Sequence, residues 1–214
     1  MAAVFLLPLV VINEVAWMGT SVAGVEQNNW WRYEWVELYN NGDIVELLNG
    51  WTLELYRDTL DFRIPLEGAI NPRGYFLVGA SDKILNLDLN YTNLAGKFVN
   101  SGQKIVLKNR AGEIVDEIDA RSGWPAGDNE TKRTLERVQK GFQTSADVGG
   151  TPRGRNSSGF QKEKPPTSYG DRNIKLIDSN PFNSPVVPAF LLAGVSALVM
   201  VVLRRRFQKS DFLE

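Results

Sequence analysis

Residues 104–118 read KIVLKNRAGEIVDEI, and this stretch carries the clearest structural signal in the chain. Two short apolar runs flank a turn-forming Asn-Arg-Ala-Gly sequence. Alternate side chains share a face in a β-strand, so a period of two residues indicates strands and not a helix. We therefore predict a β-hairpin with Ile105 and Leu107 on one face of its first strand. In its second strand, Ile114 and Ile118 are predicted to share a face.

The same pattern extends over residues 10–156, where short apolar runs alternate with turns rich in Gly, Pro and Asn. No long amphipathic helix interrupts it. Many short strands separated by such turns are typical of a sandwich or a barrel. The fold class that we predict is therefore all-β. The predicted strands are Val10–Trp17, Tyr33–Asn40, Ile44–Leu48, Trp51–Tyr56, Tyr75–Ala80, Lys104–Lys108, Glu113–Ile118 and Thr134–Val138.

Composition limits the chemistry that this chain can perform. The 214 residues suffice for one domain with appendages, and they include no His and no Cys. Zinc sites built on His or Cys, imidazole bases and thiol nucleophiles are therefore excluded. Residues 1–156 carry 20 acidic and 16 basic side chains. An acidic domain does not attract phosphate backbones over a broad surface, so nucleic acid is only a weakly supported partner.

The amino-terminal residues 1–9 open an apolar run that continues to Ile12. Its length suits the hydrophobic part of a signal peptide and is too short to span a bilayer. No basic residues precede it, and it has no clear cleavage site. Two interpretations remain open, a truncated export signal whose true start lies upstream and the beginning of a buried first strand. Val10–Trp17 is a strand under both.

The carboxyl-terminal part changes character twice. Residues 157–184 are polar and Pro-rich, which predicts a disordered linker. Residues 185–203 are uncharged and mostly apolar; as a helix they would measure about 28 Å, close to the thickness of a bilayer core. Arg204, Arg205 and Arg206 follow at once. The excess of positive charge on that side predicts a single-pass cell-membrane protein, with residues 204–214 as a cytoplasmic tail and the β-domain extracellular.

Several short blocks, in order, resemble the lamin tail domain, an immunoglobulin-like β-sandwich. The resemblance implies that residues 10–156 form such a sandwich, of the type that bacterial surface proteins anchor in a membrane. It supplies no reaction, catalytic residue or cofactor, so we expect a non-enzyme without cofactors. The blocks are VINEVAW at residues 11–17, WVELYN at 35–40, LNGWTL at 48–53, INPRGYFLV at 70–78, NSGQKIVL at 100–107, GEIVD at 112–116, Trp124-Pro125 with TLER at 134–137, and TPRGRN at 151–156.

An aromatic cluster between the first two predicted strands is the candidate ligand-binding site. The sequence NNWWRY at residues 28–33 contains Trp30, Trp31 and Tyr33, more aromatic surface than a solvated loop needs. Exposed aromatic side chains stack on sugars or fill a partner's pocket. The alternative, equally weighted, is that they fold down over one end of the sandwich.

Three acidic residues in predicted strands are weak candidates for a metal site or an acid–base pair: Glu14, Glu37 and Asp116. Calcium favours six to eight oxygens from closely spaced acids in a loop, which isolated acids on three strands match poorly. The interpretation that we favour is that these carboxylates accept hydrogen bonds from loop backbone or from Arg.

Three functions are compared. The first is a cell-surface module that binds or adheres to an extracellular protein, a glycan or, with weaker support, DNA, and that sits in the bilayer through residues 185–203. The second is a scaffold subunit of a membrane complex, for which the small residues of Ala193-Gly194 and Ser196-Ala197 offer close helix contact. The third, a hydrolase that uses carboxylates and a metal, is the least supported.

Overall fold

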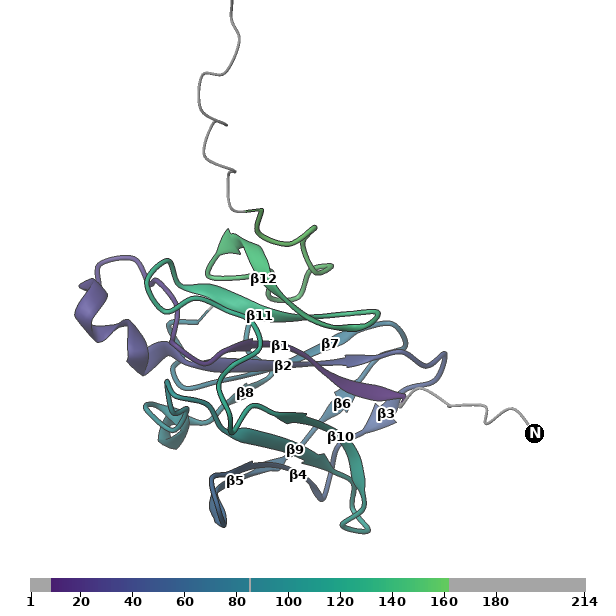
Figure 1. Ribbon diagram of the computed structural model, residues 1–214. Helices are drawn as coiled ribbons and strands as arrows, with labels where there is room; N and C mark the ends of the chain where they lie inside the picture. Colours follow the sequence, from purple (N-terminus) through teal and green to yellow (C-terminus); the bar gives the residue numbers. More distant parts are fainter. Residues whose placement is uncertain (1–8, 85, 162–214) are drawn as a thin grey trace, which may run out of the picture. The chain divides into compact units, whose positions relative to one another are not determined.

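The computed structural model describes residues 9–84 and 86–161 and shows an all-β sandwich (Figure 1). The first sheet has six strands in the order β12-β11-β1-β2-β7-β8, and the second has four in the order β10-β9-β4-β5. The strands of the first sheet are β1 Val10–Ala16, β2 Trp35–Asn40, β7 Tyr75–Gly79, β8 Leu89–Asn90, β11 Arg133–Val138 and β12 Gly141–Val148. Those of the second sheet are β4 Trp51–Tyr56, β5 Leu60–Leu66, β9 Lys104–Lys108 and β10 Ile114–Asp119.

Short elements close the two ends of the sandwich. At one end, β3 (Glu46–Leu47) pairs with β6 (Ala69–Ile70) close to the start of β1. At the other end lie two 3-10 helices, η1 (Gln27–Tyr33) and η2 (Thr92–Leu94). In Figure 1 they occupy the left side of the domain, opposite β3 and β6. We call this side the η1 end.

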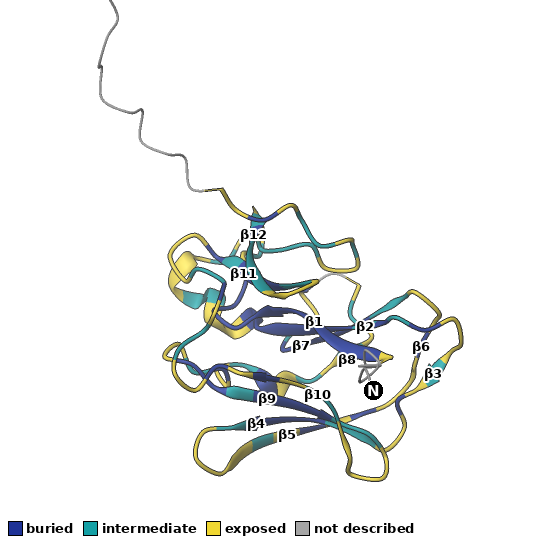
Figure 2. Cartoon of the chain, turned by 45° about the vertical axis from the view of Figure 1, so that its right-hand side comes forward, coloured by how far each residue is buried: buried dark blue, intermediate teal, exposed yellow. Residues whose placement is uncertain are grey.

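The core lies between the two sheets, as the buried strands in Figure 2 show. Ile12 and Leu38 from the first sheet and Leu53 and Leu107 from the second are fully buried members of one apolar cluster. β1 is buried along its whole length. Strands of an antiparallel sheet commonly leave one face in water, so the burial of both faces of β1 means that another segment covers its outer face.

Most predicted strands are confirmed within a few residues, and the predicted hairpin becomes β9 and β10. One detail of that hairpin was wrong. Ile114 is 57% exposed, whereas Ile118 is buried, so these two side chains do not share a face. The register shifts between Ile114 and Asp116, and the extra residue of this β-bulge reverses the alternation.

Four strands were missed: β5, β6, β8 and β12. β6 and β8 have two residues each, too few to show a period. β5 forms an edge of the second sheet, and it contains Pro65, which sequence rules confine to edges. In β12 polar side chains replace the expected apolar run, because this edge strand packs little core.

The predicted linker (157–184), membrane helix (185–203) and tail (204–214) lie largely or wholly outside the described residues, as does most of segment 1–9. In the part of the chain that the structure does describe, no helix is long and apolar enough to cross a membrane.

Candidate functional site

Two of the predicted acidic residues meet on the outer face of the six-stranded sheet. Glu14 of β1 lies opposite Glu37 of β2 and also opposite Glu136 of β11, so three glutamates form one row across the sheet. All three are fully buried. A β-bulge between Ile12 and Glu14 adds Asn13 next to this row, where its side-chain amide donates to Glu37 (2.9 Å). We call Glu14, Glu37 and Glu136 the glutamate row.

The cover over the glutamate row is an extended segment, residues 149–157, which we call the strap. The backbone N–H of Thr151 donates to Glu14 Oε1 (2.9 Å), and that of Arg153 donates to Glu37. Ser157 donates to Glu136 through its backbone N–H (3.0 Å). A backbone N–H of the strap therefore donates to each of the three carboxylates.

Side chains of the strap add a second set of bonds. The Thr151 hydroxyl lies within hydrogen-bond distance of both Glu14 (3.0 Å) and Glu136 (3.1 Å), and its single proton serves one of them at a time. Asn156 exchanges amide hydrogen bonds with Asn13 (2.9 and 3.1 Å). Arg153 pairs with Asp88 in the segment before β8. The strap thus lies over β11, β1 and β2, reaches the segment before β8 at Arg153, and returns to β11 at Ser157.

The electrostatics of the glutamate row follow from burial. Desolvation raises the pKa of Glu14 to about 7 and that of Glu37 to about 8, although hydrogen bonds to each carboxylate oppose the shift. No Lys or Arg of the described residues forms an ion pair with any of the three glutamates. The row is therefore stabilised by neutral donors and not by cations.

Asp116 lies apart from the row and joins the two sheets. Its Oδ2 accepts from the backbone N–H of Ile12 (2.7 Å) and from the guanidinium of Arg137 (2.6 Å). Burial raises its pKa, while Arg137 lowers it. Within residues 9–84 and 86–161, no group of three or more acidic residues is arranged to hold a metal ion. The three predicted acids thus serve two different hydrogen-bonded sites.

A second charged group occupies the outer face of the four-stranded sheet. Glu54 of β4 is almost fully buried, and its carboxylate accepts from Lys108 (2.7 Å), Arg63 (2.7 Å) and the Tyr56 hydroxyl. Burial alone would raise the pKa of Glu54, but these partners outweigh it and hold the pKa at about 2. Here cations neutralise the carboxylate.

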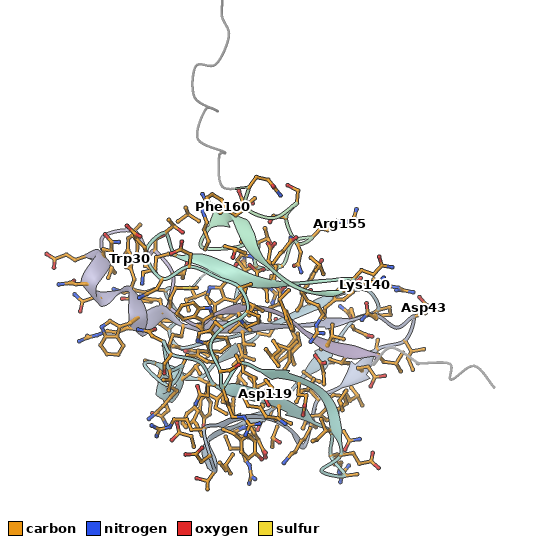
Figure 3. All side chains as sticks on the ribbon, in the orientation of Figure 1. Trp30, Asp43, Asp119, Lys140, Arg155 and Phe160 are labelled. Atoms are coloured by element: carbon orange, nitrogen blue, oxygen red, sulfur yellow. The ribbon has the colours of Figure 1, made fainter. Side chains whose placement is uncertain are left out.

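The predicted aromatic cluster does not form one exposed surface. Tyr33 is buried in the core. Trp30, labelled in Figure 3, is half-buried, and its indole N–H donates to the Val25 carbonyl (2.9 Å). Trp31 is 45% exposed. The reason is the 3-10 turn, which sends three nearby side chains in different directions. Trp31 is therefore the member of the cluster that is free to contact a ligand.

A groove of about 490 Å³ opens between the loop before η1 and the strap. Trp35 lines it together with Val22, Ile84 and Pro152, and Lys83 supplies its charge. This volume lies within the range of small-ligand sites, about 300–1,000 Å³. The groove is a second candidate contact surface, and sequence reasoning did not find it because its lining comes from four separate segments.

Four basic residues in or near β11 are close in sequence but do not form a surface patch that could bind nucleic acid. Lys132 is buried and donates to the Met18 carbonyl (3.2 Å), Arg133 stacks on Phe160, and Arg137 binds Asp116. Lys140, at the β11–β12 turn, stays exposed (Figure 3). Three of the four charges are thus used within the domain.

Comparison with protein families supports the fold described above. The family model of the lamin tail domain matches residues 8–122, more than half of the chain. No curated protein matches the chain. The matched range includes β1 to β10 and therefore contains Glu14, Glu37 and Trp31, while β11, β12 and the strap follow it.

Proposed function

The chain belongs to the lamin tail domain family, and on that premise we propose that it is a non-catalytic binding module displayed at the outer surface of a cell membrane. The family is a non-catalytic, immunoglobulin-like one. In this chain, the buried carboxylates of the outer faces already accept hydrogen bonds from the protein itself. The functional element that has to be identified is therefore a surface that contacts a partner.

The observation that carries this proposal is the exposure of Trp31. A tryptophan that is 45% exposed offers apolar surface to water, although the domain has an extensive core in which to bury it. Its backbone is held in place, because the end of η1 is tied to the loop after β1 by a hydrogen bond from Thr20 N to Tyr33 O (3.1 Å). Rigid aromatic anchors of this kind dominate binding energy at interfaces.

Membrane display is the second part of the proposal, and the sequence supports it. Residues 185–203 are uncharged over a length that suits a bilayer, and Arg204–Arg206 follow them. We infer that residues 1–184 face the exterior. Protease added to intact cells should then remove the β-domain, whereas a domain cleaved only after permeabilisation would contradict this orientation.

Binding is tested by retention of the detergent-solubilised full chain on washed cell envelopes. We expect Trp31→Ala to lower the apparent affinity about tenfold, the effect of a moderate hot spot. Phe160→Ala is the matched control, because Phe160 is also a partly exposed aromatic (41%) but lies beside Arg133. Equal retention of both variants would refute the Trp31 surface, provided that thermal unfolding shows both to be folded.

The scaffold alternative makes a different prediction in the same material. If the helix and not the β-domain made the contacts, a chain without residues 185–214 would lose its membrane partners while Trp31→Ala kept them. Co-purification of the full chain, the truncated chain and Trp31→Ala separates the two functions.

A further inference from the structure

Two cations at the η1 end rest on aromatic rings. The guanidinium carbon of Arg32 lies 5.1 Å from the ring centroid of Trp31, and Nζ of Lys97 lies 5.2 Å from that of Phe62. Both cationic side chains are exposed. Neither forms an ion pair with any residue that the structure describes. Two positive charges are therefore available to an external anion.

These groups are contiguous. Gly96 packs against Trp31 so closely that a Cβ would lie 3.0 and 3.2 Å from two ring carbons, and its φ of +71° also favours glycine. Lys97 follows directly. Phe62 in turn contacts Tyr91, with ring centroids 5.9 Å apart. We call Trp31, Arg32, Phe62, Tyr91 and Lys97 the aromatic–cation strip.

The loop beneath the strip is held in place from inside. Glu34 is almost fully buried, and its Oε2 accepts from the backbone N–H groups of Lys97 (3.0 Å) and Phe98 (3.4 Å). The Trp124 indole donates to the Val99 carbonyl (2.8 Å) in the same loop. A surface that is already ordered loses little conformational entropy when it binds.

The chemistry of the strip selects the class of ligand. Unpaired Arg and Lys attract carboxylates or phosphates, and the exposed part of Trp31 packs against sugar C–H groups. Sites for single-stranded nucleic acid stack successive bases on several exposed rings, whereas in the strip Trp31 is 45% exposed and Phe62 and Tyr91 are partly buried.

We propose that the aromatic–cation strip binds an acidic polysaccharide, whose carboxylates pair with Arg32 and Lys97 while a sugar ring packs on Trp31. This inference rests on the proposed function, because it names the ligand class of the same surface. A polymer presents the same group repeatedly, so modest contacts at one strip suffice for retention at a surface where many copies are displayed.

The test uses the full chain in detergent and three polymers of equal length: polygalacturonate, neutral dextran and oligo-thymidylate. We expect binding to polygalacturonate, none to dextran, and weaker binding to oligo-thymidylate. The double variant Arg32→Gln, Lys97→Gln should lower the polygalacturonate affinity at least about tenfold, because it removes both positive charges that pair with the carboxylates. Lys140→Gln, an exposed cation at another site, should leave it unchanged.

Three results would overturn the inference: equal binding of dextran, tighter binding of oligo-thymidylate, or polygalacturonate binding that the double variant does not reduce. Failure here is separable from failure of the proposed function. If polygalacturonate does not bind but Trp31→Ala still lowers envelope retention, the ligand class is wrong and the binding surface stands. If the strip binds polygalacturonate but protease does not reach the domain on intact cells, the outer location is wrong.

Discussion

The outer faces of the two sheets each bury carboxylates, but they stabilise them by opposite means. On the six-stranded sheet, Glu14 and Glu37 accept hydrogen bonds from backbone and side-chain donors of the strap and its neighbours, and burial raises their pKa values to about 7 and 8. On the four-stranded sheet, Lys108 and Arg63 surround Glu54, and its pKa falls to about 2. Burial favours the neutral carboxyl group unless cations are close enough to outweigh the loss of water.

The contrast shows which face holds a segment outside the two sheets in place. The cations around Glu54 come from neighbouring strands that already pair in the sheet. The donors to the glutamate row come mainly from the strap, which belongs to neither sheet. Perturbing the row should therefore affect the strap, whereas perturbing Glu54 should affect only its own surroundings.

The largest effect is expected from Gly150→Ala in the strap. A Cβ at this position would overlap Oε1 of Glu14 and lie 2.6 Å from the Thr134 hydroxyl, and φ is +79°. Overpacking and backbone strain together should lower the unfolding free energy by about 4 kcal/mol. Gly112→Ala is the control, since its φ is +82° but a Cβ would meet nothing within 4 Å. It should cost about 1 kcal/mol.

Urea denaturation of both variants measures this difference. Equal destabilisation would mean that the strained φ alone matters and that the strap does not lie tightly against the row.

The pH dependence of stability should follow the glutamate row. Folding raises the pKa of Glu14 from 4.5 to about 7, so the folded state holds this proton more tightly than the unfolded state does. Its contribution to the unfolding free energy is complete below pH 4.5 and is lost as the pH rises through about 7, a change on the order of 3 kcal/mol. Glu37 acts in the same direction up to about pH 8.

Urea titrations at several pH values between 4.5 and 9 check this expectation. Glu37→Gln should flatten the profile, because the amide keeps an oxygen acceptor and cannot ionise. A profile as steep as that of the unaltered protein would show that Glu37 does not titrate as its environment indicates.

A smaller effect is expected at Glu54 on the four-stranded sheet, where stability depends on pH in the opposite direction. Glu54→Gln removes the charge that binds Lys108 and Arg63, so it should lower the unfolding free energy at pH 7 by about 1–2 kcal/mol. Because folding lowers the pKa of Glu54, the lost stability is that present above pH 4.5, which the unaltered protein loses as the pH falls through about 2. A penalty that is unchanged at pH 2 would contradict the assignment.

The smallest effect should come from the side chain of Arg153, in the middle of the strap. Arg153 pairs with Asp88, and both side chains are partly exposed. Arg153→Ala should therefore cost less than about 1 kcal/mol, because solvent screens such pairs. The backbone N–H of Arg153 still donates to Glu37 in this variant. Thermal unfolding in low and high salt measures the pair, and a cost of several kcal/mol would show that the strap depends on it.

The fold was predictable because local signals and tertiary structure agree over most of the chain. The hairpin from Lys104 to Ile118 has the period, the turn and the apolar faces that its position in the sheet requires. The exceptions are physical: β-bulges shift the alternation at Ile114 and at Asn13, and edge strands such as β5 need no apolar period. Nothing local in a sequence marks where a bulge occurs.

The site was only partly predictable. Glu14 and Glu37 stood out as acids within apolar strands, but Glu136 did not, and their meeting depends on strand order and register. Tyr33 and Trp31 are two residues apart, yet one is buried and the other exposed, because η1 is a 3-10 turn and not a strand. Lys97 could not be identified from the sequence as a site residue, because the aromatic ring that it contacts, Phe62, lies on β5, which the sequence did not predict.

The strap also determines how the domain responds to mechanical force. The chain leaves the sandwich after Phe160, whose N–H donates to the Thr144 carbonyl, and the next bonds inward are those of Ser157 to Glu136. A load applied beyond residue 161 therefore meets these bonds one after another, as in peeling, and not all at once, as in shear. The strap should yield at low force and come away from the sheet, while β1 and β2, in the middle of the sheet, remain paired.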